Sequence, residues 1–110
     1  MADIRRYSVI ESNNIQLGQV GSAFVDSTGQ YTAPGSMKIV MITMLTDVEF
    51  GELTPTSTDD NFGTTAASPG SGGDTLTSSD TFPSGITIFG RWNSCELQTA
   101  GDKILIYYGP

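Results

Sequence analysis

Apolar residues recur along the chain at every second position or in short runs, and Gly, Pro and Asn separate these segments. No segment keeps the 3.6-residue apolar spacing of a helix over several turns, whereas alternation and short runs are typical of strands. Turn signals come about every 8–12 residues, which indicates an all-β sandwich or barrel. We predict a small, jelly-roll-like fold of about seven to eight short antiparallel strands. The predicted strands cover residues 5–10, 15–20, 22–25, 30–32, 38–45, 86–89, 94–99 and 103–108.

Local patterns refine this outline. Residues 38–45 form the longest apolar run and carry apolar side chains on both faces, which predicts a strand that is covered on both sides. Strand character continues through Val48 and Phe50, which alternate with acidic residues. Residues 90–93, Gly-Arg-Trp-Asn, predict a bulge or tight bend, and residues 100–102, Ala-Gly-Asp, predict a short hairpin loop before the last strand.

The stretch from 54 to 80 consists almost entirely of Thr, Ser, Gly, Asp, Ala and Pro, and its only large apolar residues are Phe62 and Leu76. A segment of this composition recovers little of its ordering entropy by burial. Structureless loops longer than about 12–15 residues are uncommon in compact domains and often carry function. We therefore predict a single β domain over residues 1–110, with 54–80 as a long low-complexity loop or arm that Phe62 and Leu76 hold to the body.

The net charge of −7 comes from 12 acids and 5 bases, and its distribution is uneven. Seven acids and no base lie between Lys38 and Arg91, so this stretch accounts for the whole net charge. Surfaces that bind nucleic-acid phosphates or anionic lipids need positive charge. We therefore predict neither nucleic-acid nor membrane binding, and we interpret the acidic middle as a solvated surface.

Export and membrane insertion are not predicted either. The opening residues, MADIRRYSVIES, lack the apolar region of a signal peptide, and the longest apolar run is too short for a membrane helix. The single cysteine, Cys95, makes no internal disulfide. We expect synthesis in a cytoplasm and interpret Cys95 as a small buried hydrophobic residue.

The residues of several common active sites are missing. The chain has no His, which excludes Ser-His-Asp and Cys-His arrangements within it, and no Gly-Lys-Ser/Thr for a phosphate loop. Glu49 and Glu52 form a possible acid pair, but such pairs are common at strand ends on surfaces. Residues 59–65, DDNFGTT, resemble the start of a calcium loop without its bidentate Glu, and predict a solvated acidic turn. We predict a protein that is not an enzyme and has no cofactor.

The apolar side chains of the predicted centre are interpreted as core. Trp92, the only tryptophan, is expected to anchor it, with Met37, Met41 and Met44 as filler. Arg91 is expected to stack nearby or to pair with an acid.

The C-terminal residues 82–109 read FPSGITIFGRWNSCELQTAGDKILIYYG. This stretch resembles the closing segment of small tailed-bacteriophage virion proteins of the head decoration, or cement, type, and it covers about a quarter of the chain. Cys95 departs from the pattern, which has Val or Thr after the Ser. The residues that carry the resemblance are Phe82, Pro83, Gly85, Thr87, Gly90, Arg91, Trp92 and Ser94.

The resemblance implies a structural protein that binds the outer surface of an assembled capsid, commonly as a trimer, and stabilises it by bridging major capsid subunits. Such a protein is made in the host cytoplasm and ends on the virion. An alternative is a tail or head-fibre module that contacts host-surface carbohydrate, with Tyr7, Tyr31, Tyr107 and Tyr108 as aromatic platforms. For the capsid or oligomer contacts, our hypothesis names Asp3, Ile4, Arg5, Arg6, Tyr7, Phe62 and Leu76.

Overall fold

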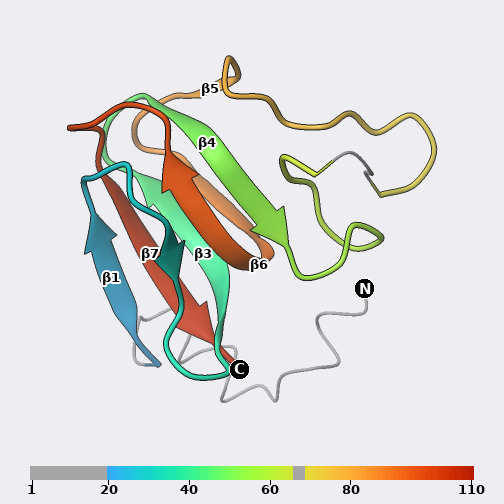
Figure 1. Cartoon of the computed structure of the whole chain (residues 1–110), viewed down its shortest axis with the longest axis horizontal. Helices are drawn as coiled ribbons and strands as arrows, with labels where there is room; N and C mark the ends of the chain where they lie inside the picture. Colours follow the sequence, from blue (N-terminus) through green and yellow to red (C-terminus); the bar gives the residue numbers. More distant parts are fainter. Residues whose placement is uncertain (1–19, 66–68) are drawn as a thin grey trace.

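Seven strands form one antiparallel sheet in the computed structural model, which describes residues 20–65 and 69–110 (Figure 1). The described residues contain no helix, so the all-β prediction is confirmed. The strands predicted at 5–10 and 15–20 lie outside the described residues, apart from Val20. The strands are β1 (Ser22–Val25), β2 (Tyr31–Thr32), β3 (Lys38–Met44), β4 (Val48–Pro55), β5 (Thr81–Phe82), β6 (Thr87–Leu97) and β7 (Ile104–Gly109).

Strand β6 folds the sheet into two layers. Its first half pairs with β3, from Thr87 to Trp92, and its second half pairs with β4, from Trp92 to Leu97. The strand order is β1-β7-β3-β6-β4-β5, and β2 also pairs with the second half of β6. In Figure 1 the orange ribbon of β6 bends sharply near its label, so that its two halves belong to different layers. The result is a small sandwich whose corner is β6.

The bend lies where the sequence predicts one, at residues 90–93, and the register of both neighbouring strands shifts there. The two strands predicted at 86–89 and 94–99 are therefore one bulged strand. Gly90 is required at this position, because a Cβ atom would lie 2.6 Å from Cζ2 of Trp92. Only a residue without a side chain lets the indole lie against the backbone.

The core fills the space between the two layers. Alternating residues of β4 and β7 point inward, as the period of two requires. Strand β3 is covered on both sides, as predicted, because Val40 and Met41 pack with Val20 and Tyr107 on the opposite face. The main core consists of Ala33, Ile39, Ile42, Met44, Val48, Phe50, Leu53, Trp92, Cys95, Leu97, Ile104 and Ile106.

Two predicted connections are wrong. Residues 100–102 do not close a hairpin, because β3 lies between β6 and β7 in the sheet. The end of β6 pairs with β4, so the chain crosses to the other layer through a turn in which Asp102 N donates to Thr99 O at 3.3 Å. The strand character predicted at Val48 and Phe50 is confirmed, but these residues begin β4 and do not continue β3. The chain turns at Thr46, whose hydroxyl oxygen accepts from Lys103 N at 3.0 Å.

Candidate functional site

The β4–β5 connection, residues 56–80, is attached to the bend of β6 at Phe62. Trp92 Nε1 donates to the Phe62 carbonyl oxygen at 2.9 Å, and the two rings pack edge to face with centroids 5.7 Å apart. Trp92 is fully buried, so its indole N–H would be costly to leave without this partner. Phe62 therefore holds the connection to the body, as the sequence predicts.

A second attachment involves Leu76. Thr64 N donates to Leu53 O at 2.9 Å, Leu53 N donates to Thr64 Oγ1 at 3.0 Å, and Leu76 N donates to Gly63 O at 2.8 Å. The Leu76 side chain packs against the core. A Cβ atom on Gly63 would lie only 2.3 Å from Leu53 O, so glycine permits this close approach of two backbones. Residues 62–64 are thus fixed beside β4 and β6, and Leu76 is fixed to them through Gly63.

Between these attachments the described part of the connection is exposed. Residues 70–74 are all exposed, and Gly70 and Gly72 take left-handed φ values of 73° and 92°. The yellow trace in Figure 1 extends away from the sheet beyond the end of β4. This stretch contributes almost no apolar side chain to the core, which matches its composition. It forms a projecting loop on a fixed base.

The Phe-Pro-Ser-Gly part of the C-terminal motif forms β5 and the turn into β6. Phe82 packs edge to face against Phe50, with ring centroids 5.5 Å apart. Pro83 is exposed, and Gly85 has a left-handed φ of 88° while its N donates to Met44 O at 2.7 Å. A non-glycine residue would be strained at this φ. These three motif residues therefore shape the entry to β6.

The Gly-Arg-Trp part of the motif forms the bend. Gly90 makes room for the Trp92 ring, and Trp92 is fully buried in the core as predicted. The Arg91 guanidinium donates from Nη1 to the main-chain oxygen of Pro110 at 2.6 Å. Gly90, Arg91 and Trp92 therefore shape the bend of β6 and the core beside it.

The outer side of the β4 layer is acidic. Glu52 lies directly opposite Glu96 across β4 and β6, and Gln30 Nε2 donates to Glu52 Oε1 at 2.8 Å. Glu49 Oε2 accepts from the Thr81 hydroxyl at 3.0 Å. Glu49 and Glu52, the possible acid pair of the sequence analysis, thus each accept a hydrogen bond from a neutral side chain.

Cys95 is a buried free thiol in β6. Burial raises its pKa to about 12, and the nearby carboxylates of Glu52 and Glu96 add to the increase. Burial, together with Tyr108 and Cys95, also raises the pKa of Tyr31. Since the thiolate is the reactive form, Cys95 is inert near neutral pH, which fits its interpretation as a core residue.

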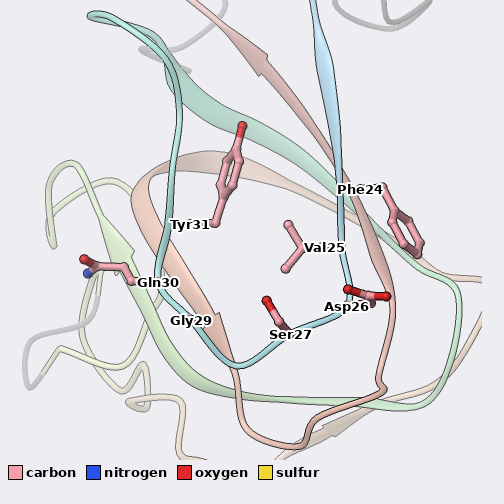
Figure 2. A pocket seen from close by; sticks show the side chains of 7 residues that line it. All are labelled: Phe24, Val25, Asp26, Ser27, Gly29, Gln30 and Tyr31. Atoms are coloured by element: carbon pink, nitrogen blue, oxygen red, sulfur yellow. The ribbon is translucent and has the colours of Figure 1, made fainter.

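A pocket of about 260 Å³ lies between the end of β1 and β2. Figure 2 shows Val25 and Phe24 on opposite sides of β1, with Tyr31 on the Val25 side. The Gln30 amide of this pocket is engaged by Glu52. The pocket therefore offers the hydroxyls of Ser27 and Tyr31 and the carboxylate of Asp26. Its other aromatic ring, Phe24, lies on the opposite side of β1 from Tyr31 and does not stack against it. Its lining residues are Phe24, Val25, Asp26, Ser27, Gly29, Gln30 and Tyr31.

The tyrosines proposed as carbohydrate platforms are at least partly covered. Tyr31 and Tyr108 pack against the main core, and Tyr107 packs against Val40 and Met41. Their rings serve packing, so these three residues do not line up in one open groove. Tyr7 lies outside the described residues.

Of the residues predicted to contact a capsid or another copy, the structure describes Phe62 and Leu76. These two lie together at the base of the projecting loop. In residues 59–65, which resemble the start of a calcium loop, Asp59 is exposed whereas Asn61 is buried. The oxygen ligands at these two positions therefore lie in different surroundings. Within residues 20–65 and 69–110, no three His, Cys, Asp or Glu side chains gather as metal ligands would. Asp3, Ile4, Arg5, Arg6 and Tyr7 lie outside the described residues.

No protein-family model, curated protein or solved structure matches this chain. No helix of membrane-spanning length and hydrophobicity occurs in the part of the chain that the structure describes.

Proposed function

We propose that this protein is a non-enzymatic structural component of a tailed-bacteriophage virion. In this role it binds the outer surface of the assembled capsid and bridges major capsid subunits. The sequence support is the resemblance of residues 82–109 to decoration proteins. The structural support is the β4–β5 connection, which projects from a base fixed by Phe62 and Leu76.

The mechanism is mass action. A protein that binds the assembled shell but not the dissociated subunits stabilises the shell in proportion to the binding free energy. The projecting loop suits this role, because an extended polar segment can lie across a neighbouring subunit and become ordered on contact. A trimer, the state that the resemblance implies, would place three such loops around a symmetry axis of the shell.

The contacts with the capsid are assigned to two regions. One is residues 3–7, where Arg5 and Arg6 are the only adjacent bases and would meet acidic capsid surface. The other is the β4–β5 connection, where the exposed residues 70–74 would reach the neighbouring subunit.

Co-sedimentation tests the proposal. Purified protein is mixed with assembled heads, with free major capsid subunits and with tails, and the bound fraction is measured in each case. We expect binding to heads alone, together with a higher melting temperature of the heads. Equal binding to free subunits, or no binding to heads, would contradict the proposal. A protein that ignores heads but binds host glycans would instead be a carbohydrate-binding fibre module.

A further inference from the structure

One outer surface of the sandwich keeps large apolar side chains exposed, whereas a solvated sheet face is usually polar. It is the outer side of the layer formed by β1, β7, β3 and the first half of β6 (Figure 1). Across these strands Phe24 lies opposite Leu105, and Met41 lies opposite Phe89. Phe89 is 65% exposed and Phe24 is 53% exposed, more than any other large apolar side chain of the described residues. We call this surface the outer β3 face and define it by Phe24, Met41, Thr43, Thr87, Phe89 and Leu105.

The chain enters this layer over its outer side. Gly21 O accepts from Tyr108 N at 3.1 Å, so the pairing of β1 with β7 extends back to Gly21. A Cβ atom on Gly21 would meet the Tyr108 ring, which packs against the main core, so the Gly21 position faces the inner side. Val20, the first described residue, therefore points outward, and it packs against the cluster of Val40 and Met41 in β3. Because β7 lies between β1 and β3, Val20 reaches over the face and away from the sheet edge at β1.

Val20 covers only the middle of the face, because Phe24 and Phe89 remain exposed on the strands to either side, β1 and β6. The hydroxyls of Thr43 and Thr87 lie 2.9 Å apart and bond to one another, so these polar groups already have a partner. Further apolar side chains could therefore cover the face without stranding a polar group at its centre. The cover that Val20 begins leaves two aromatic rings open.

The rim of the face is basic. The strands of this layer contain no Asp or Glu, and Lys38 and Lys103 lie at strand ends. Arg91 shares the side of Phe89 in β6, and its guanidinium donates to the main-chain oxygen of Pro110 at 2.6 Å. Acids at the ends of an apolar occupant would thus meet bases at the rim.

Residues 1–19, which precede Val20, have the composition of such an occupant. They contain two acids and two bases and are neutral, whereas the rest of the chain has ten acids and three bases and carries the whole charge of −7. Residues 4–10, IRRYSVI, hold most of the large apolar side chains of this stretch and lie between Asp3 and Glu11. A second copy would instead bring another −7 to the face, and repulsion disfavours it.

We propose that residues 4–10 of the same chain dock across the outer β3 face and cover Phe24 and Phe89. Strand alternation turns Tyr7 and Val9 to the face together and leaves Arg6 on the other side. Seven extended residues span about 20 Å and four strands are about 15 Å wide, so this segment can cross the whole layer.

The connection to Val20 makes this docking favourable. Residues 11–19 include the Asn13-Asn14 turn signal, which lets the chain return from the face to β1. Because the segment and the face belong to one chain, they meet at a high effective concentration, and a small apolar contact suffices. This inference does not rest on the capsid role, and it leaves Arg6 available to a partner.

The test locates the segment in the full chain with a nitroxide spin label on Ser8→Cys. The buried thiol of Cys95 stays unlabelled. Nuclear magnetic resonance measures how strongly the label broadens each backbone amide signal, and the unbroadened signals verify that the chain folds. The matched control carries the label on Ser71→Cys, in the exposed stretch of the projecting loop.

We expect the label at position 8 to broaden the amide signals of Phe24, Thr43 and Phe89, and the label at position 71 to spare Phe24. Adding Tyr7→Ser to the chain labelled at position 8 should abolish the broadening, whereas Arg6→Ser should retain it. Sharp signals across the face overturn the proposal, and so does broadening that Tyr7→Ser leaves intact.

A mixture of two preparations distinguishes the chain's own segment from that of a second copy. One preparation carries the spin label, and the other carries the nitrogen isotope that is observed. We expect the observed chain to keep sharp signals in this mixture. Broadening at Phe24 and Phe89 would place a second copy on the face and overturn the proposal. Since no heads are present, neither result bears on the capsid role.

Discussion

Trp92 contacts Phe62 in two ways at once, because its indole N–H donates to the Phe62 carbonyl oxygen while its ring packs edge to face against the Phe62 ring. The two residues are 30 positions apart in the sequence. One is at the corner of the sandwich and the other is in the long polar connection. This pair therefore joins the fold of the body to the position of the projecting loop.

Replacing Trp92 by Phe tests how much its hydrogen bond to the Phe62 carbonyl and its packing contribute to stability. The change removes the buried donor of the Phe62 carbonyl and leaves a gap in the core, so we expect the free energy of unfolding to fall by about 2–3 kcal/mol. Urea denaturation followed by far-ultraviolet circular dichroism measures it, since the variant has no tryptophan to follow.

Phe62→Leu is the matched comparison for that change. It keeps the main-chain carbonyl and its hydrogen bond, and loses only ring packing on a half-buried side chain. We expect a smaller loss, about 1 kcal/mol. A loss as large as that of Trp92→Phe would mean that the hydrogen bond contributes little.

Gly63 should tolerate no side chain. The Cβ atom of Gly63→Ala would lie 2.3 Å from Leu53 O and 2.6 Å from Pro55 Cδ, so either β4 or the connection must shift. We expect a destabilisation of about 1–3 kcal/mol in thermal or urea unfolding. Gly29→Ala is the control, because a Cβ atom there meets nothing within 4 Å. Its stability should stay within about 0.5 kcal/mol of the unmodified chain, and equal losses in both variants would refute the steric explanation.

The sequence predicted those parts of the fold that depend on local patterns. The apolar run of β3, the bend at Gly90 to Trp92 and the turn at Gly85 all follow from residue type and spacing. The anchoring role of Phe62 was also predictable, because it is one of only two large apolar residues in a long polar stretch.

Local patterns could not predict which strands belong to which layer of the sandwich. The turn after Thr99 has the composition of a hairpin loop, but β3 occupies the place beside β7 that a hairpin would give to β6. This pairing depends on how far β6 bends, and the bend is a property of the whole sheet. The outward position of Phe89 follows from the same cause, since the alternation in β6 shows two faces but not which one is covered.

Cys95 should make stability depend on pH above neutrality. Its pKa rises from 9.0 in the unfolded chain to about 12 in the folded protein, so between these values the native state retains a proton that the unfolded state has lost. The native state then binds more protons, and the free energy of unfolding decreases as pH rises. The contribution is complete below pH 9 and is lost toward pH 12, with a slope of at most about 1.4 kcal/mol per pH unit.

Comparison with Cys95→Ala isolates this effect, because the tyrosines and lysines titrate in both proteins. Urea unfolding at a series of alkaline pH values should show a steeper decline for the unmodified chain than for the variant. Parallel declines would show that the thiol keeps an ordinary pKa in the folded state. A thiol reagent gives an independent measurement, since Cys95 should react only as fast as the protein opens.

Shortening the projecting loop should separate capsid binding from folding. Deletion of residues 70–73 removes exposed Gly and Ser that contribute no core side chain, while Phe62, Gly63 and Leu76 keep their attachments. Because the entropy of loop closure changes slowly with length, we expect the free energy of unfolding to change by less than about 0.5 kcal/mol. Affinity for assembled heads should fall on the order of tenfold if the loop reaches a neighbouring subunit. Ser71→Ala at unchanged length, which keeps Gly70 and Gly72 at their left-handed φ, is the control, and it should bind more tightly than the deletion. Full head binding by the shortened chain would remove the loop from the contact surface and leave residues 3–7 as the assigned region.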